Sequence, residues 1–155
     1  MKIREPVERD IDHIARLLLE THDAHVSAFP DLYREFSFDE ARGIVASRLV
    51  EKNSFYRIAE INGEIAGYTY FQLKTAAATP FTLERTFAYV CEIAVEDANR
   101  RSGVGGFLMD SVIKCCKELG VARLELDVWS FNDAALSFFE SRDFRVVGRK
   151  MGRAI

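Results

Sequence analysis

The chain has 155 residues, of which 48% are hydrophobic and 29% are charged, and this suits a single globular domain over residues 1–155. The composition excludes a disordered or fibrous protein. With 21 lysines and arginines against 24 aspartates and glutamates, the net charge is -3, so we expect no broad cationic surface and no binding of nucleic acid.

The cysteines and the N-terminus indicate where the protein works. The 3 cysteines, two of them adjacent at Cys115 and Cys116, lie at no spacing typical of zinc or redox motifs. We read them as buried, reduced thiols and expect no metal. Residues 1–5 carry charge where a signal peptide needs an apolar run, and no stretch approaches the roughly 18 apolar residues of a membrane span. A cytoplasmic protein without membrane contact is expected.

Two helices are predicted near the N-terminus. Asp10 can cap a helix over 10–22, in which apolar residues recur at helical spacing. Residues 37–40 form a capping box, serine followed three positions later by glutamate, and predict a second helix over 38–51. The segment 22–36 between them has no clear period and reads as a loop or a short helix able to act as a lid.

Three strands follow. Asn62-Gly63 tolerates positive φ at both turn positions and joins two predicted strands, 55–61 and 64–73, into a hairpin. After a loop over 74–82, the run 87–95 is the third strand.

The C-terminal part predicts a helix from Gly103 to Leu119, with Gly120 at the left-handed cap position. A half-buried strand over 124–128 and a short helix capped by Asn132 or Asp133 come next. Residues 144–155 suffice for one strand or two very short ones. Helices and strands together indicate a mixed α+β fold.

The segment 95–106 is the most informative part of the sequence. A strand ends there, Arg100 and Arg101 follow, and glycines lead into a helix, so that free backbone N–H groups and the positive end of the helix dipole suit a phosphate. A Walker loop is excluded because no lysine follows Gly106, and a dinucleotide fingerprint fits poorly because Leu108 stands where its third glycine belongs.

This segment resembles the acetyl-CoA loop of the GNAT superfamily of N-acetyltransferases, in which Arg or Gln is followed by two residues, Gly, one residue, and Gly or Ala. Arg100, Gly103 and Gly105 match that pattern, and Asn132-x-x-Ala135 follows in the family's order. The resemblance covers nearly the whole chain. It implies a central, mostly antiparallel twisted sheet flanked by about four helices.

The resemblance also implies a cofactor site for acetyl-CoA as co-substrate. In the family, pantetheine pairs with the main chain of the fourth strand, here at Ile93 and Val95, and a backbone N–H of that strand holds the oxyanion. The implied cofactor residues are Ile93, Ala94, Val95, Arg100, Arg101, Ser102, Gly103, Val104, Gly105, Gly106, Asn132 and Phe139.

Glu92 is the first candidate for the catalytic base. It lies three residues before Val95 on the cofactor strand, where many relatives carry a carboxylate that takes the amine proton directly or through water. The other reading of Glu92 is a solvated carboxylate that only attracts a cationic substrate.

Phe139 departs from the family pattern, since relatives often carry a tyrosine there that protonates the departing thiolate. Either coenzyme A leaves as thiolate, or Tyr89 or Tyr33 donates the proton. His25, Phe29 and Tyr33 lie in the segment that lines the acceptor site in the family, and they are candidates for substrate contact or for ordinary core packing. Trp129 reads as a packing residue.

The leading prediction is an acetyl-CoA-dependent N-acetyltransferase that acts on a primary amine of a small molecule or peptide, with a homodimer as a further expectation from the family. One alternative is a non-catalytic acyl-CoA sensor or partner-binding module on the same fold. Another, which depends on the glycine loop alone, is a nucleotide-binding regulatory domain.

Overall fold

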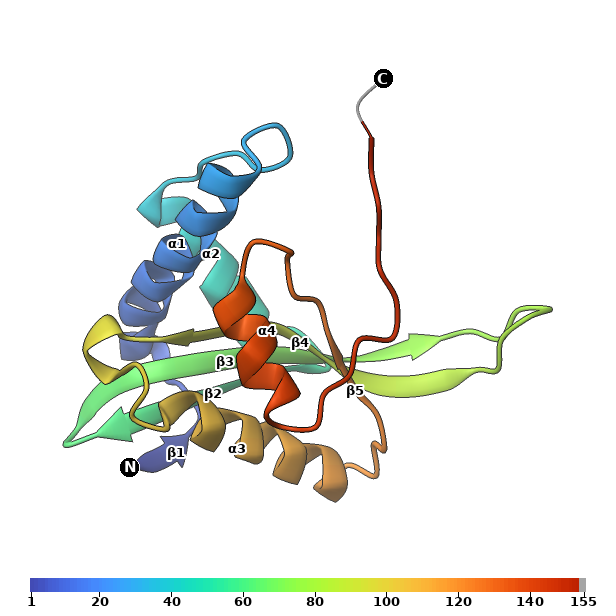
Figure 1. Ribbon diagram of the computed structural model, residues 1–155. Helices are drawn as coiled ribbons and strands as arrows, with labels where there is room; N and C mark the ends of the chain where they lie inside the picture. The colour runs from blue at the N-terminus through green and yellow to red at the C-terminus, as the bar shows by residue number, and fades with distance from the viewer. Residues whose placement is uncertain (154–155) are drawn as a thin grey trace.

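The computed structural model describes residues 1–153, and it contains one sheet covered by helices on both faces (Figure 1). The strands are β1 (Lys2–Arg4), β2 (Ser54–Ile61), β3 (Glu64–Ala76), β4 (Arg85–Val95) and β5 (Leu124–Leu126). The helices are α1 (Ile11–Ala28), α2 (Phe38–Leu49), α3 (Val104–Glu118) and α4 (Asp133–Glu140), with short 3-10 turns η1 (Glu8–Asp10) and η2 (Asp97–Asn99).

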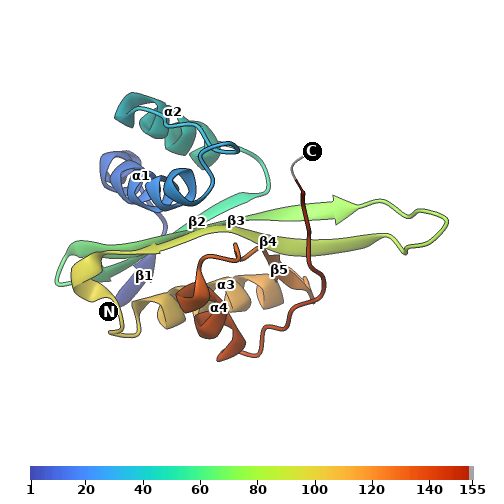
Figure 2. The same ribbon diagram turned by 45° about the horizontal axis from the view of Figure 1, so that its top comes forward.

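The strands lie in the order β1-β2-β3-β4-β5, and all neighbours are antiparallel except the parallel pair β4 and β5. Helices α1 and α2 cover one face of the sheet, and α3 and α4 cover the other (Figure 2). The predicted mixed α+β fold with a mostly antiparallel sheet is therefore confirmed.

Each face of the sheet has its own hydrophobic core. On the side of α1 and α2, Ile14 and Leu18 pack with the buried side chains of Tyr56, Tyr68 and Tyr70. On the side of α3 and α4, residues of α3 pack with residues of the sheet and of α4, and the buried members include Phe71, Val90, Met109, Val112 and Phe139. The middle of β3 and β4 is thus fixed from both sides.

The local signals of the sequence are confirmed where they are strongest. The Ser37 hydroxyl accepts from the Glu40 N–H at 3.2 Å, and the Glu40 carboxylate accepts from the Ser37 N–H at 2.7 Å, as a capping box requires. Asn62 and Gly63 have φ of 53° and 88° in the hairpin turn. Gly120 has φ of 68° after α3.

The first helix is longer than predicted, and residues 23–28 of the segment predicted as a loop or a short helix are its continuation. Helix α1 continues to Ala28 and carries His22 and His25 on its last two turns. It ends at Phe29, with φ -140° and ψ 67°, because the following Pro30 disfavours helical backbone at the residue before it.

The C-terminal strands also differ from the prediction. The strand predicted over 124–128 ends at Leu126, because β4 and β5 stop pairing there. The strand predicted over 144–155 is absent from residues 144–153, and residues 154–155 lie outside the described part of the chain. Val146 and Val147 are 54% and 84% exposed, so this segment has no buried face to hold it against the sheet. Other boundaries shift by one to three residues.

Within residues 1–153, no helix has both the length and the apolar character needed to cross a membrane. The three cysteines are free thiols, and no group of three or more His, Cys, Asp or Glu in the same residues is arranged to hold a metal ion.

Candidate functional site

The sheet opens between β4 and β5. The two strands pair only from Ala88 with Leu124 to Val90 with Leu126, and beyond that point they separate. A cavity of about 290 Å³ occupies the opening. Its walls come from α1, the α1–α2 loop, β4, the chain after β5, and α4, and they include Thr21, His22, His25, Tyr33, Cys91, Glu92, Ile93, Asp127, Trp129, Asn132 and Phe139.

A β-bulge at Cys91 decides how β4 faces this opening. Phe71 of β3 lies opposite Val90, and the next residue back, Tyr70, lies opposite Glu92, so Cys91 is the extra residue. Before the bulge, the Ala88 N–H points toward β5 and donates to the Arg123 carbonyl at 2.9 Å.

After the bulge, the alternation of β4 is reversed. The Glu96 N–H, eight residues after Ala88, points toward β3 and donates to the Ala66 carbonyl at 3.0 Å. Because peptide groups alternate along a strand, even-numbered residues after the bulge pair with β3. The main-chain groups of Ile93 and Val95 are therefore directed at the opening.

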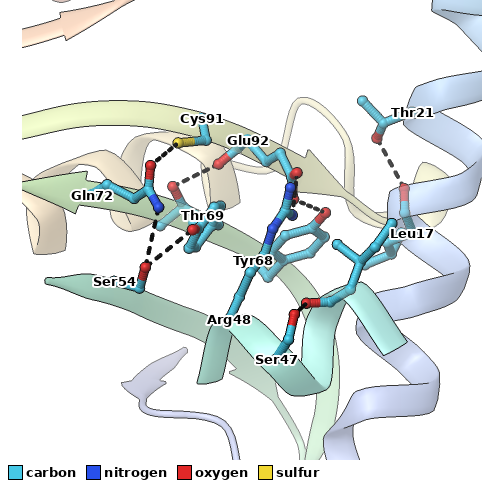
Figure 3. Close-up of polar contacts among 12 residues, drawn as sticks. Leu17, Thr21, Ser47, Arg48, Ser54, Tyr68, Thr69, Gln72, Cys91 and Glu92 are labelled. Carbon is cyan, nitrogen blue, oxygen red and sulfur yellow. Dashed lines mark hydrogen bonds and ion pairs between the residues drawn. The ribbon is translucent and has the colours of Figure 1, made fainter. Parts of the chain in front are cut away.

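Glu92 is held at three points (Figure 3). Its Oε1 accepts from Arg48 Nη1 of α2 at 2.6 Å, and its Oε2 accepts from the Tyr68 hydroxyl at 2.9 Å. Its carbonyl accepts from the Thr69 hydroxyl at 2.9 Å. The Glu92 side chain is 14% exposed and lines the cavity from the face of α1 and α2. Burial, helped by the Glu92 charge, raises the pKa of Tyr68 well above its usual value, so this phenol stays protonated and donates.

The glycine loop presents main-chain donors at the start of α3. Arg101 and Gly103 have positive φ, 60° and 90°, and the first hydrogen bond of the helix runs from the Phe107 N–H to the Gly103 carbonyl at 3.0 Å. The N–H groups of residues 104–106 precede that bond and so remain available to an anion.

Two polar side chains of this loop are used within the loop itself. The Arg100 guanidinium is paired with Asp97 at 2.7 Å and also donates to the Val95 carbonyl at 3.4 Å. The Ser102 hydroxyl donates to the Asn99 carbonyl at 2.5 Å. These contacts brace the loop, and the donors that face outward are those of the main chain.

Helix α4 forms the wall opposite α1. The Asn132 side chain caps it, with Oδ1 accepting from the Ala135 N–H at 3.0 Å, and it also lines the cavity. Phe139 is 6% exposed and packs edge-on against Phe138 and Phe144, with ring centroids 5.0 and 5.4 Å away. Phe139 is therefore both a core residue and part of the cavity wall.

Aromatic side chains close the end of the cavity near α1. His25 and Tyr33 line the cavity, as does Trp129, whose ring centroid lies 5.5 Å from that of Tyr33. Phe29 does not line the cavity. It packs behind it against Trp129, at 5.1 Å between centroids. Nδ1 of His25 donates to the Thr21 carbonyl at 2.8 Å, which leaves Nε2 as the acceptor nitrogen of a neutral ring.

The two phenols considered as proton donors lie in different places. Tyr33 lines the cavity, and burial raises its pKa. The Tyr89 hydroxyl is not part of the lining; it donates to Asp127 Oδ2 at 2.6 Å. Of the two, Tyr33 is in position to reach a group in the cavity.

Several residues of this site were not predicted from the sequence: Arg48, Tyr68, Thr69, Cys91 and Asp127. Trp129 was read as packing alone, although it also lines the cavity. Burial raises the pKa of the Cys91 thiol to about 11, so it stays protonated and is a poor nucleophile. The sequence gives no signal for the residues around Glu92, because strand register and a bulge bring them together. Neither the register nor the bulge can be recognised from a short stretch of sequence.

Comparison with known proteins decides the family. A sequence profile of the "Acetyltransferase (GNAT) family" matches residues 18–144. The chain belongs to this family of acetyltransferases. An N-alpha-acetyltransferase of Sulfurisphaera tokodaii is 24% identical over 151 residues, which cover 94% of this chain and 81% of that protein.

Solved structures share the fold of this chain. A tetramutant of the BH1408 protein from Bacillus halodurans has a TM-score of 0.93 at 25% identity, with all of both chains covered. The aminoglycoside antibiotic 6'-N-acetyltransferase of Acinetobacter haemolyticus has a TM-score of 0.77 at 15% identity, covering 100% of this chain and 98% of that one. The second likeness concerns the fold alone.

Proposed function

We propose that this GNAT acetyltransferase is an N-acetyltransferase that uses acetyl-CoA and acts on a primary amine of a small molecule or peptide. The observation that carries the proposal is the opening between β4 and β5, where Glu92 and Ile93 line one cavity and the main chain of Val95 faces the same opening. The amine-acetylating relative from Sulfurisphaera tokodaii also supports an amine acceptor.

The residues present fit acetyl-CoA. The N–H groups of residues 104–106 would hold the pyrophosphate, and the main chain of Ile93 and Val95 would pair with pantetheine as an added strand does. Bound in this way, acetyl-CoA supplies an activated acetyl group at the cavity. The Asn132 amide and the Phe139 ring would contact its thiol end from α4.

Glu92 would receive the proton that the amine must lose. A primary amine with a pKa near 10.4 is only about one part in a thousand neutral at pH 7.4, which costs roughly 4 kcal/mol. The ammonium form of the acceptor would lose its first proton through Glu92 to solvent, and the neutral amine would then attack. In the transfer, an N–C bond forms, the C–S bond breaks, and the sulfur leaves with the bonding pair. The second proton of the nitrogen passes to Glu92 or to the departing thiolate. Arg48 and Tyr68 hold the carboxylate in place, and each of its oxygens keeps a second lone pair for the incoming proton.

The cavity walls suit a cationic acceptor. Glu92 and Asp127 are acidic, and no lysine or arginine is among the lining residues in the described part of the chain. The aromatic rings of Tyr33 and Trp129 add faces that attract a cation. An ammonium group can therefore approach the site before it loses its proton.

The experiment is a thiol-release assay with acetyl-CoA against a panel of amines, with mass spectrometry of the products. We expect release to depend on an amine and to yield the N-acetylated product, and Glu92→Gln to lower kcat while leaving acetyl-CoA affinity nearly unchanged. Binding of acetyl-CoA without turnover by any amine would instead indicate an acyl-CoA sensor. If the pH–rate profile of Glu92→Gln overlays that of the parent, Glu92 is not the base.

A further inference from the structure

Thr69 is a buried hydroxyl on β3 that neither the core nor the cavity wall requires. Its side chain is 0% exposed, and it lies opposite Ile93 in the register of β3 and β4. A valine would fill nearly the same space, so packing alone does not explain a hydroxyl here.

The hydroxyl has one partner, and that partner sits at the bulge. Thr69 Oγ1 donates to the Glu92 carbonyl at 2.9 Å (Figure 3). The Glu92 carbonyl directly follows the extra residue of the bulge, where the regular alternation of β4 is interrupted. The Thr69 hydroxyl adds a side-chain hydrogen bond from β3 to β4 at this position.

We propose that Thr69 is a positioning residue for acetyl transfer, because its hydrogen bond fixes the bulge that orients both the Glu92 carboxylate and the main chain of Ile93 and Val95. This inference rests on the proposed function. Arg48 and Tyr68 hold Glu92 only at the tip of its side chain. Thr69 holds the peptide group from which that side chain departs.

The register shows what depends on the bulge. With strict alternation from Ala88 onward, Ile93 and Val95 would turn their main-chain groups to β3, and the Glu92 side chain would turn to the face of α3 and α4. The base would then lie on the wrong side of the sheet from Arg48 and Tyr68. The Thr69 hydroxyl thus affects both the position of Glu92 and the direction of the main-chain groups of Ile93 and Val95.

The test compares Thr69→Val, which keeps the shape and removes the donor, with Thr69→Ser, which keeps the donor. We expect Thr69→Val to lower kcat by about 10- to 100-fold, since small misplacements of reacting groups have effects of this size, and Thr69→Ser to restore most of it. Hydrogen exchange of β4, measured without acetyl-CoA, should speed up over residues 91–95 in Thr69→Val and stay near the parent's rate in Thr69→Ser. Should Thr69→Val not fold, Thr69→Cys, a weaker donor of similar size, takes its place.

A second comparison separates this inference from the proposed function. In a Glu92→Gln background, Thr69→Val should reduce kcat further by much less than it does in the parent, because part of its effect passes through Glu92. If kcat, the pH profile and the exchange rates are unchanged in Thr69→Val, the positioning role is wrong and the proposed function still stands. The same conclusion follows if Thr69→Val lowers kcat and Thr69→Ser lowers it equally. If the parent acetylates no amine, the proposed function fails, and the exchange measurement alone decides whether Thr69 fixes the bulge.

Discussion

Gly67 of β3 lies against the end of β4, the strand that we propose pairs with acetyl-CoA, and replacing it by alanine is a sharp test of the packing there. A Cβ at Gly67 would lie 2.5 Å from the Ala94 carbonyl oxygen, 3.1 Å from Val95 Cα and 3.3 Å from Val104 Cγ1. The first two neighbours belong to the main chain of β4, so no rotamer change relieves the contact. Because ordinary contacts begin near 3.4 Å, β3 and β4 must separate locally.

We expect Gly67→Ala to destabilise the fold by about 1–3 kcal/mol, the usual range for overpacking a well-filled core. For a chain of this size that lowers Tm by about 2–12 °C, at about 2–4 °C per kcal/mol. Since the displaced segment carries Val95 and leads to the glycine loop, acetyl-CoA affinity should fall as well. Thermal melts and isothermal titration calorimetry measure the two effects.

Gly43→Ala is the matched control. Gly43 is an exposed residue inside α2, and a Cβ there meets nothing within 4 Å, so the change should stabilise the helix by about 0.5–1 kcal/mol and leave cofactor affinity alone. If Gly67→Ala melts at or above the parent's Tm and binds acetyl-CoA normally, the close approach of β3 to Ala94 and Val95 is wrong.

Three further changes test separate parts of the molecule. Gly105→Asp should abolish micromolar affinity for acetyl-CoA in calorimetry, because it places a negative charge at the proposed phosphate donors. Gly105→Ala, whose Cβ would meet the Phe138 ring at 3.4 Å, should be tolerated. Unchanged affinity in Gly105→Asp would mean that the loop is not part of the site. Phe139→Tyr should keep acetyl-CoA affinity and raise kcat a few-fold, which is well below the typical 10²–10⁴-fold effect of a general acid. A fall in kcat would mean that Tyr33 or another group already donates a proton to the departing thiolate. Asp10 is buried and accepts from Arg4 at 2.6 Å, which holds the pKa of its carboxyl below the usual range. The Asp10 carboxylate therefore stabilises the fold above its unfolded pKa near 3.9, and this stabilisation is lost as the pH falls. At pH 7 the parent should exceed Asp10→Asn in free energy of unfolding by about 1–3 kcal/mol. In urea titrations this difference should disappear below about pH 4.

The sequence predicted the elements whose signals are local. The capping box at Ser37, the Asn62-Gly63 turn and the αL position of Gly120 each depend on a few neighbouring residues, and each appears in the structure. The glycine loop before α3 was found for the same reason. The phosphate donors that we propose there are main-chain groups whose exposure follows from the residue types.

The rest depends on contacts between distant parts of the chain. Arg48 reaches Glu92 across 44 positions, and no spacing in the sequence relates them. The bulge at Cys91 is a property of two strands together, so β4 alone could not show on which face Glu92 lies. The prediction of a strand after Phe144 was wrong for residues 144–153 for a similar reason, since a strand needs a neighbouring edge as well as a suitable composition.

A crystal structure of the complex with acetyl-CoA tests the central claim most directly. The account predicts the pyrophosphate on the N–H groups of residues 104–106, pantetheine paired with the main chain of Ile93 and Val95 between β4 and β5, and the thioester beside Glu92 in the cavity. Acetyl-CoA bound elsewhere, or a pantetheine chain paired with neither residue, would contradict it.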